Sequence, residues 1–359
     1  MRSSIIIISI AFIFLCSCKN ENGNSVIAVG QMPNLVKDNS DNIHLVYGNG
    51  DSILYSYSSD RGSTFSAPSL ISILPKLAAS HTRGPQIAST SKGLTVTACN
   101  EMGDIFSFAK DGSGKWSQGA RVNDMDTVAK ENLMALGADG DNTFVVWLDL
   151  RDKHNKIFGA KSTDGGKSWS KNIMIYASPD TTVCECCKPS VAVKGNNVYV
   201  MFRNWLNGNR DLYLIQSSDN GNTFEQVQKL GNGSWALNGC PMDGGGIAIN
   251  NRGNPETVWN RKSVIYACEP GKEEKELGKG KDCTIESVNG KNVYAWVEDG
   301  EVIILKPRGM KKNLGKGHLP VIKAVNNEHI LCVWENGKQI YKAIVELQLQ
   351  NSINKIKLK

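Results

Sequence analysis

Beyond residue 15 the sequence lacks any apolar run near the 20 residues that a helix needs to span a membrane. It also lacks segments in which apolar residues repeat at the i, i+3, i+4, i+7 spacing of an amphipathic helix. The formal net charge is +6, but the lysines are scattered and gather only in the segments KEEKELGKGKD and PRGMKKNLGKG. A nucleic-acid-binding protein would concentrate its basic residues on one element. The sequence therefore offers no basis for a helical membrane domain or a nucleic-acid partner, and surface anionic glycans are the more natural acidic partner.

The first residues are the exception to this shortage of apolar runs. Arg2 precedes an apolar run from Ile5 to Leu15, which is too short to cross a bilayer as a mature helix and is typical of an export signal. Residues 15–18, LCSC, resemble the lipobox of bacterial lipoproteins, which implies cleavage before Cys18 and lipidation of that cysteine. We expect a signal peptide over residues 1–17, a flexible tether over 18–27, and lipid anchoring in a bacterial cell envelope. An ordinary secretory signal without lipid is the alternative.

Short alternating strand patterns, bounded by Gly, Asn and Asp, recur along the rest of the chain. One module occurs seven times: an apolar first strand, a polar turn, a second strand that ends in a large residue, a loop and a third strand. The second strands end at Tyr47, Cys99, Trp147, Phe202, Trp259, Trp296 and Trp334, which are 52, 48, 55, 57, 37 and 38 residues apart. Such periods are typical of propeller blades, which complete their core by packing radially around an axis. The sequence predicts a single all-β propeller of four-stranded blades over residues 28–359, with seven blades favoured and six as the alternative.

Three of the third strands run into a turn with a shared signature. The segments SSDRGSTF, STDGGKSW and SSDNGNTF place a serine two residues before Asp60, Asp164 and Asp219, and a glycine two residues after each. The carboxylate is suited to accept hydrogen bonds from turn amides, and glycine adopts the backbone geometry that other residues avoid. These turns resemble the Asp-box, or BNR repeat, of bacterial sialidases and related non-hydrolytic propellers. The resemblance implies a sialidase-like propeller in which the three aspartates are structural and lie opposite the active site.

The propeller arrangement predicts which polar residues share a face. The loops after the second strands open on the same side as the segments before the first strands, and we call this side the open face; the Asp-box turns open on the far face. Loop residues that meet around a propeller axis are candidates for a binding site. The candidates are Arg83, Arg203 and Arg261 for an anionic group, Asn204 and Trp205 for a sugar ring, and Glu101, Glu131 and Asp149 as acid/base groups. For each of them, a structural bond to a neighbouring carbonyl or charge is the alternative.

The family resemblance implies a specific hydrolytic chemistry. Sialidases use a tyrosine nucleophile activated by a glutamate, an aspartate acid/base, and three arginines that bind the sugar carboxylate. This sequence has no Arg-Ile-Pro motif in its first module, where the family carries one. No open-face tyrosine has a glutamate beside it, because Tyr199 and Tyr294 fall within strands. The sequence thus predicts the fold more firmly than the activity.

Cysteines form the other notable group on the open face. The segment VCECCKPSVAV holds Cys184, Cys186 and Cys187 just before the fourth first strand, and Cys240 precedes the fifth. The motifs around them resemble a bacterial lipoprotein subgroup of sialidase-like propellers. In an oxidising compartment we favour disulfides, for example between Cys240 and one of the other three. The alternative is a Cu(I) or Zn site in which Met242 and His81 add ligands.

The remaining cysteines have simpler interpretations. Cys268 and Cys283 flank a polar loop and are candidates for a second bridge, whereas Cys99 and Cys332 lie in apolar strands and are expected to be small core residues. Taken together, we expect an exported, monomeric propeller that binds or hydrolyses carbohydrate at its open face and requires no cofactor. The alternative is a non-catalytic metal-binding or scaffolding propeller built around the cysteine cluster.

Overall fold

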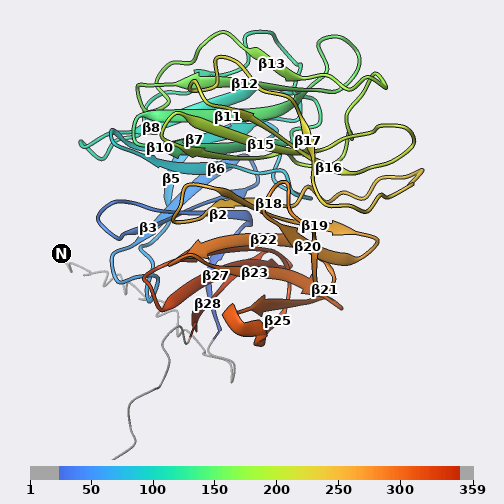
Figure 1. Ribbon diagram of the computed structural model, residues 1–359. Coiled ribbons are helices and arrows are strands. Elements are labelled where there is room, and N and C mark those ends of the chain that lie inside the picture. Colours follow the sequence, from blue (N-terminus) through green and yellow to red (C-terminus); the bar gives the residue numbers. More distant parts are fainter. Residues whose placement is uncertain (1–23, 348–359) are drawn as a thin grey trace, which may run out of the picture.

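A computed structural model describes residues 24–347, which form seven four-stranded antiparallel sheets and one short 3₁₀ turn, η1 (Pro307–Gly309) (Figure 1). The predicted all-β propeller is confirmed, with seven blades rather than six. Within residues 24–347, no helix has the length and apolarity to cross a membrane. The predicted signal peptide and Cys18 lie outside the described residues.

Each blade consists of strands that follow one another in the chain, except the last. Blade 1 contains β2 (Gln31–Lys37), β3 (Ile43–Asn49), β4 (Ser52–Ser58) and β5 (Ser69–Ile73), and blade 2 contains β6 (Gln86–Thr90), β7 (Gly93–Cys99), β8 (Ile105–Lys110) and β9 (Ala120–Arg121). Blade 3 contains β10 (Met134–Asp139), β11 (Asn142–Asp149), β12 (Lys156–Ser162) and β13 (Ile173–Tyr176), and blade 4 contains β14 (Ser190–Lys194), β15 (Asn197–Arg203), β16 (Leu212–Ser217) and β17 (Gln228–Lys229). Blade 5 contains β18 (Gly246–Ile249), β19 (Pro255–Arg261), β20 (Val264–Cys268) and β21 (Lys275–Lys279), and blade 6 contains β22 (Lys281–Val288), β23 (Lys291–Glu298), β24 (Glu301–Leu305) and β25 (Lys311–Lys316).

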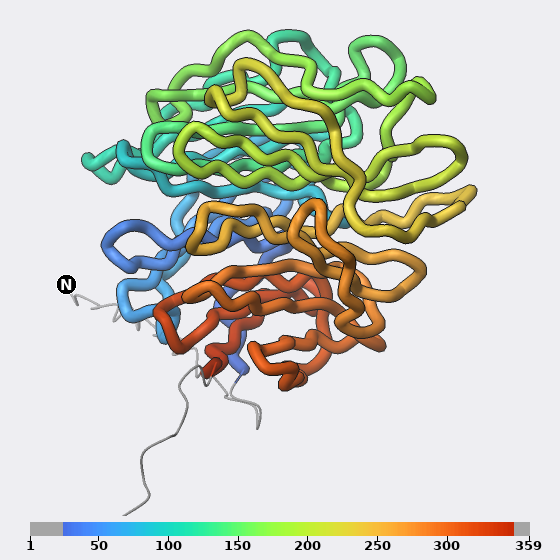
Figure 2. Tube along the Cα trace, viewed as in Figure 1, coloured from blue at the N-terminus to red at the C-terminus, as the bar shows by residue number. Residues whose placement is uncertain are grey.

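Blade 7 closes the ring by combining both ends of the described chain. Its strands β26 (His318–Ala324), β27 (His329–Asn336) and β28 (Gln339–Glu346) are joined by β1 (Ser25–Val29), which pairs antiparallel with β28. Figure 2 shows these blue and red segments side by side. Residues 25–27, which we expected in the tether, therefore belong to the propeller, because β1 supplies the strand that the last module lacks.

The hydrophobic core lies between neighbouring blades. Val146 of blade 3 and Val200 of blade 4 belong to one buried cluster, and Val302 of blade 6 and Cys332 of blade 7 belong to another. The large residue at the end of the second strand is also buried; Trp147, for example, has no exposed surface. Each sheet therefore covers one face of the next, as radial packing of the repeat requires.

The three Ser-x-Asp turns follow β4, β12 and β16 at the far face. Asp60 Oδ1 accepts a hydrogen bond from the backbone amide of Thr64 (2.8 Å), and Asp60 Oδ2 accepts one from the Thr64 hydroxyl (2.6 Å). Asp164 and Asp219 accept the corresponding bonds in blades 3 and 4. Hydrogen bonds from the Thr64 side chain and amide lower the pKa of Asp60 to about 2. These carboxylates hold the turns together, as the sequence predicted.

The glycines of these turns touch the preceding blade. A Cβ on Gly166 would lie 2.3 Å from Thr95 Cγ2 of blade 2, and one on Gly221 would lie 2.2 Å from the Phe144 ring of blade 3. The Thr95 hydroxyl also donates a hydrogen bond to the Gly165 carbonyl (2.8 Å). The turns therefore join adjacent blades at the far face, which explains why they need a residue without a side chain.

This contact predicts a difference between two glycines that both have positive φ. Gly140 (φ 59°) has no atom within 4 Å of the Cβ position, whereas Gly166 (φ 80°) meets Thr95. We expect Gly140→Ala to lower the free energy of unfolding by about 1 kcal/mol through backbone strain alone. Gly166→Ala should cost about 1–3 kcal/mol more, because the methyl group overpacks the blade interface. Urea denaturation measures both, and equal losses would contradict a packing role for the turn.

Candidate functional site

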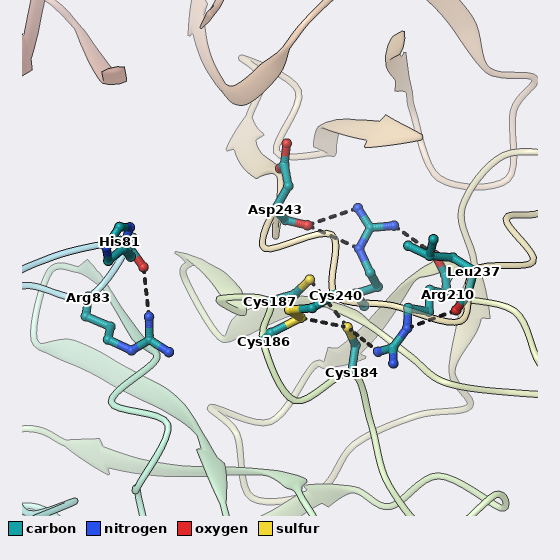
Figure 3. The surroundings of a disulfide bond; sticks show 10 residues. His81, Arg83, Cys184, Cys186, Cys187, Arg210, Leu237, Cys240 and Asp243 are labelled. Atoms are coloured by element: carbon teal, nitrogen blue, oxygen red, sulfur yellow. Dashed lines mark hydrogen bonds between the residues drawn. A yellow bond between two sulfur atoms is a disulfide. The ribbon is translucent and has the colours of Figure 1, made fainter. Parts of the chain in front are cut away.

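One disulfide joins the open-face loops of two adjacent blades (Figure 3). Cys186, in the segment before β14, bonds to Cys240, in the segment before β18, with an S–S distance of 2.03 Å and a sequence separation of 54 residues. This confirms the expected link between Cys240 and one of the three clustered cysteines. No sheet hydrogen bonds connect these two segments in the described residues, and a native disulfide typically stabilises a fold by about 2–4 kcal/mol.

Two further thiols lie beside this disulfide. The Cys184 and Cys187 sulfurs are 3.4 Å apart, and the Cys184 sulfur is 3.8 Å from that of Cys186. Cys184 and Cys187 are 0% and 1% exposed. Arg210 Nη1 donates a hydrogen bond to Cys184 Sγ (3.0 Å), as Figure 3 shows. Hydrogen bonding with Cys187, together with the positive charge of Arg210, lowers the pKa of Cys184, whereas burial raises the pKa of Cys187.

The guanidinium of Arg203 is buried next to this cluster. Its side chain lies at the end of β15 and is 1% exposed. It donates to three backbone carbonyls: to Asp243 from Nε (3.1 Å) and Nη2 (2.9 Å), to Asn260 from Nη2 (2.8 Å), and to Arg210 from Nη1 (2.8 Å). Within residues 24–347, Arg203 makes no ion pair with a carboxylate. The side chain therefore holds the open-face loops of blades 4 and 5 together, and it places a buried positive charge near the thiols.

A pocket of about 240 Å³ lies on the propeller axis at the open face. We call it the axial pocket. All seven innermost strands contribute to it at or near their first residues, namely Asn34, Gln86, Ala135, Ser190, Gly246, Thr284 and Val321. Gly244 also lines it, where a Cβ would lie 1.8 Å from the Lys188 carbonyl oxygen. The cysteine cluster borders this pocket, because Cys187 directly precedes Lys188 in the chain.

Three charged residues line the axial pocket. Lys188 Nζ donates a hydrogen bond to Gln86 Oε1 (2.9 Å), and burial lowers the pKa of Lys188 to about 8. The Asp243 carboxylate accepts bonds from the amides of Gly245 (3.2 Å) and Asp282 (3.1 Å), and burial raises its pKa. Burial, aided by the nearby charge of Asp243, raises the pKa of Asp282 to about 6. The pocket thus combines one weakly basic amine with two weakly acidic carboxyl groups.

The three predicted arginines do not line this pocket together. Arg203 is committed to carbonyls, as described above. Arg83 Nε donates to the Glu131 carbonyl oxygen (2.7 Å) and Arg83 Nη1 to that of His81 (3.1 Å), and Figure 3 shows Arg83 apart from the cysteine cluster. Arg261 pairs with Glu274 and stacks over the Tyr266 ring at 4.1 Å. All three arginines therefore bond to neighbouring carbonyl or carboxylate groups, which was the alternative to a ligand-binding role.

The three predicted acidic residues differ in environment. Asp149 is fully buried and accepts hydrogen bonds from Trp147 Nε1 (2.8 Å) and from Arg151 Nε (2.9 Å). Glu101 is exposed on its loop. Glu131 is half-buried, and burial raises its pKa against the opposing charge of Arg83. Only Glu131 of the three combines partial exposure with a pKa shifted toward that of a proton donor.

The remaining predicted residues, Trp205, Asn204 and Met242, lie in the chain segments that follow Arg203 and Cys240. Trp205 is half-buried, with the Arg210 guanidinium 4.5 Å from its ring centroid. Asn204 is fully buried and donates a hydrogen bond to the Tyr176 hydroxyl (2.9 Å). Met242 is 43% exposed. Trp205 is already covered by a cation on one face, so a ligand has access to less of its ring than the sequence suggested.

The other cysteines are buried thiols. The expected bridge between Cys268 and Cys283 is wrong, since both are unpaired and belong to different buried clusters. Cys99 and Cys332 are core residues, as predicted. Three Sγ atoms, of Cys184, Cys186 and Cys187, lie within 4.8 Å of one another, which is close enough to hold a metal ion.

Sequence reasoning missed several functional candidates. Lys188, Gln86 and Asp282 line the axial pocket, but each sits at or beside an innermost strand in a pattern that predicts only a strand. Arg210 was not among the predicted site residues, because its bond to Cys184 depends on how the loop after β15 folds back. The sequence feature that could have indicated the pocket is a polar or charged residue at or just before the start of an innermost strand.

Comparison with known proteins finds similarity in fold but not in sequence. No family model matches it, and no curated protein matches it either. Virginiamycin B lyase from Staphylococcus aureus has a similar structure, with a TM-score of 0.51 and 12% identity over 91% of this chain and 96% of that one. Aleuria aurantia lectin, in complex with Fucα1-6GlcNAc, has a TM-score of 0.51 and 11% identity over 82% of this chain and 97% of that one. NanB sialidase from Streptococcus pneumoniae has a TM-score of 0.47 and 12% identity, covering 96% and 72%. At these identities the likeness shows the fold alone.

The raised pKa of Asp282 predicts that replacing this residue increases the stability of the fold, and that the increase depends on pH. Because its pKa rises from 3.8 to about 6 on folding, its contribution to stability is fully present below pH 3.8 and is lost as the pH rises through 6. Asp282→Asn should therefore raise the free energy of unfolding by about 1–2 kcal/mol at pH 7.5 and leave it almost unchanged at pH 3.5. Thermal and urea unfolding at both pH values measure this, with Asp299→Asn on an exposed turn as the control. An equal effect at both pH values would contradict the assignment.

Proposed function

We propose that this protein binds carbohydrate in its axial pocket. The observation that carries the proposal is the convergence of polar side chains from different blades, including Asn34, Gln86, Lys188 and Thr284, on one cavity at the axis. A volume of about 240 Å³ is below the roughly 300–1,000 Å³ of pockets for drug-sized ligands and suits a single sugar ring.

The chemistry of the pocket favours a neutral, polyhydroxylated ligand over an anionic one. Sugar hydroxyls both donate and accept hydrogen bonds, and the pocket offers a donor at Lys188 and acceptors at Asp243 and Asp282. Lys188 is the only basic residue among the described residues that line it, and two carboxyl groups oppose its charge. The lectin that shares this fold was solved with Fucα1-6GlcNAc, so a propeller of this kind is able to present a sugar site.

The structure offers less support for hydrolysis of a carbohydrate than for its binding. Glu131 is the preferred acid/base candidate, since Asp149 is already bonded to Trp147 and Arg151, and Glu101 is exposed on its loop. A sialic acid carboxylate would meet no arginine in the axial pocket, because Arg203 and Arg261 are committed to other partners. We therefore propose a binding protein, anchored through Cys18 in a bacterial envelope; that cysteine lies outside the described residues.

The cysteine cluster supports a second candidate function, the binding of a soft metal such as Cu or Zn. The supporting observation is that three Sγ atoms lie within 4.8 Å and that the fourth, of Cys240, is bonded to one of them. Thiolates are the ligands that Cu(I) and Zn prefer.

The carbohydrate proposal predicts an effect of Lys188→Met on glycan binding. On a glycan array followed by calorimetry, we expect at least one glycan to bind and the variant to weaken it about 10- to 100-fold. The reason is that a charged donor contributes about 1.5–3 kcal/mol to a hydrogen bond. The matched control is Lys92→Met, which removes an exposed lysine at the far face and should leave binding unchanged. Absence of any glycan ligand, or equal binding by Lys188→Met, would overturn the proposal.

The arginine positions predict the result of a sialidase assay. We expect a fluorogenic sialoside to be turned over no faster by the protein than by Arg83→Ala or Glu131→Gln variants, because no arginine cluster faces the axial pocket. Turnover that falls in both variants would instead establish a hydrolase with Glu131 in its site.

A further inference from the structure

The four sulfurs at the junction of blades 4 and 5 form an unusual site because two of them are in a disulfide and two are thiols. Cys184 and Cys187 are free, and Cys186 is bonded to Cys240. The sulfurs of the free pair are 3.4 Å apart, and Cys184 lies 3.8 Å from Cys186. In a tetrahedral zinc site with Zn–S bonds of about 2.3 Å, neighbouring sulfurs are about 3.8 Å apart. Three of the sulfurs, those of Cys184, Cys186 and Cys187, thus lie at separations close to those of a metal site, and Cys240 is bonded to one of them.

Within residues 24–347, the two arginines beside the cluster, Arg203 and Arg210, make no ion pair with a carboxylate. Arg203 is 1% exposed and bonds only to carbonyl oxygens among the described residues. Arg210 bonds to Cys184 Sγ and to the Leu237 carbonyl oxygen. A buried charge is costly unless an opposite charge lies close to it. The cluster sulfurs are able to supply negative charge next to Arg210 when a metal binds, because a bound metal removes the protons from its thiol ligands.

Charge balance then depends on the state of the disulfide. Binding of a metal removes the protons from its thiol ligands, so in the disulfide form Cys184 and Cys187 then supply two thiolates, which match the two arginines. A monovalent ion adds a single positive charge, whereas a divalent ion adds two in a nearly dry site. With the disulfide reduced, four thiolates exceed the two arginines by two negative charges, and a divalent ion restores neutrality.

Coordination number leads to the same assignment. Zn(II) in structural sites takes four ligands, so the two free thiols of the disulfide form do not satisfy it. Cu(I) is a soft ion that thiolates select, and two sulfur ligands are sufficient for it. Met242, which is 43% exposed, follows Cys240 by two residues and is a further candidate soft ligand.

We propose that the cysteine cluster is a soft-metal site whose selectivity is set by the Cys186–Cys240 disulfide, with Arg203 and Arg210 as its fixed counter-charges. The disulfide form binds one Cu(I) ion between Cys184 and Cys187. The reduced form binds one Zn(II) ion through all four sulfurs. This inference rests on the second function proposed above, and it adds the identity of the metal and the condition for its exchange.

Conversion of the disulfide form to the reduced form requires a reductant, and we assign this role to an external dithiol. The dithiol passes two electrons and two protons to the Cys186–Cys240 bond, which becomes two thiols while the dithiol becomes a cyclic disulfide. Cys240 is the exposed end of the bond and Cys186 is half-buried, so attack on the Cys240 side is accessible. Binding of Zn(II) then releases the protons still held by the four thiols.

The test uses the full chain in two forms, untreated and reduced with a phosphine under argon. Cu(I), kept reduced by ascorbate, and Zn(II) are each titrated against a chromophoric competitor, and native mass spectrometry gives the stoichiometry. We expect one Cu(I) per untreated protein. The affinity for Zn(II) should rise about 100-fold or more when the disulfide is reduced, because two ligands are added.

Variants separate the parts of this site. Cys184→Ser/Cys187→Ser should abolish the binding of both metals, and Cys186→Ser/Cys240→Ser should retain Cu(I) and lose the reduction-dependent Zn(II) binding. Cys99→Ser, a buried thiol of blade 2, is the matched control and should change neither. Arg210→Met should weaken Cu(I) binding about tenfold, with partial recovery in Arg210→Lys, because the charge next to Cys184 is restored. Circular dichroism of each variant verifies folding.

The outcomes distinguish this inference from the function on which it rests. If neither metal binds in either form, metal binding at the cluster and its control by the disulfide are both overturned. If one metal binds equally well in both forms, the cluster is a metal site but the disulfide does not select its metal. Reversed preferences, with Zn(II) in the untreated protein, would overturn the proposed assignment of the two metals to the two forms, while the cluster would remain a metal site.

Discussion

Pairing between β1 and β28 is the constraint on which the rest of the structure depends. The seven sheets meet around a single axis only if the last blade is completed, because an incomplete blade would leave an exposed edge. The far face strengthens the same junction: Gly62 lies against Leu331 of blade 7, and Lys342 Nζ of β28 donates to the Gly62 carbonyl (2.8 Å). Closure brings the first residues of all seven innermost strands together and thereby creates the axial pocket.

The two faces of the ring are held together by different means. At the far face, hydrogen-bonded turns such as that of Asp164 reach the preceding blade. At the open face of blades 4 and 5, the Cys186–Cys240 bond and the three carbonyl contacts of Arg203 take this role. The consequence is that Arg203, which sequence reasoning assigned to a ligand, instead brings a fixed charge to the sulfurs. A substitution of Arg203 would therefore both loosen the junction of blades 4 and 5 and remove the positive charge beside the sulfurs.

Sequence was sufficient for most of the fold and for part of the site. The repeat of buried residues such as Trp147 and Trp296 predicted the blades, because radial packing requires them at the same position in each sheet. The role of β1 was missed, since its pairing with β28 is a contact between distant segments without a local pattern. The contact between Cys186 and Cys240 could be predicted, because both cysteines lie in loops of adjacent blades. The ion pair between Arg261 and Glu274 could not be predicted, because it depends on where the chain after β20 folds back.

The disulfide also changes how the chain is connected. Between its two cysteines lies all of blade 4, so this blade forms a covalently closed loop of the main chain. A protease that cuts once between residues 187 and 239 would leave both fragments joined, and they would separate only after reduction. The described residues contain no second disulfide, so within them nicking of another blade would leave the fragments connected by noncovalent contacts. Blade 4 is therefore the part of the ring in which a single backbone break does not divide the polypeptide.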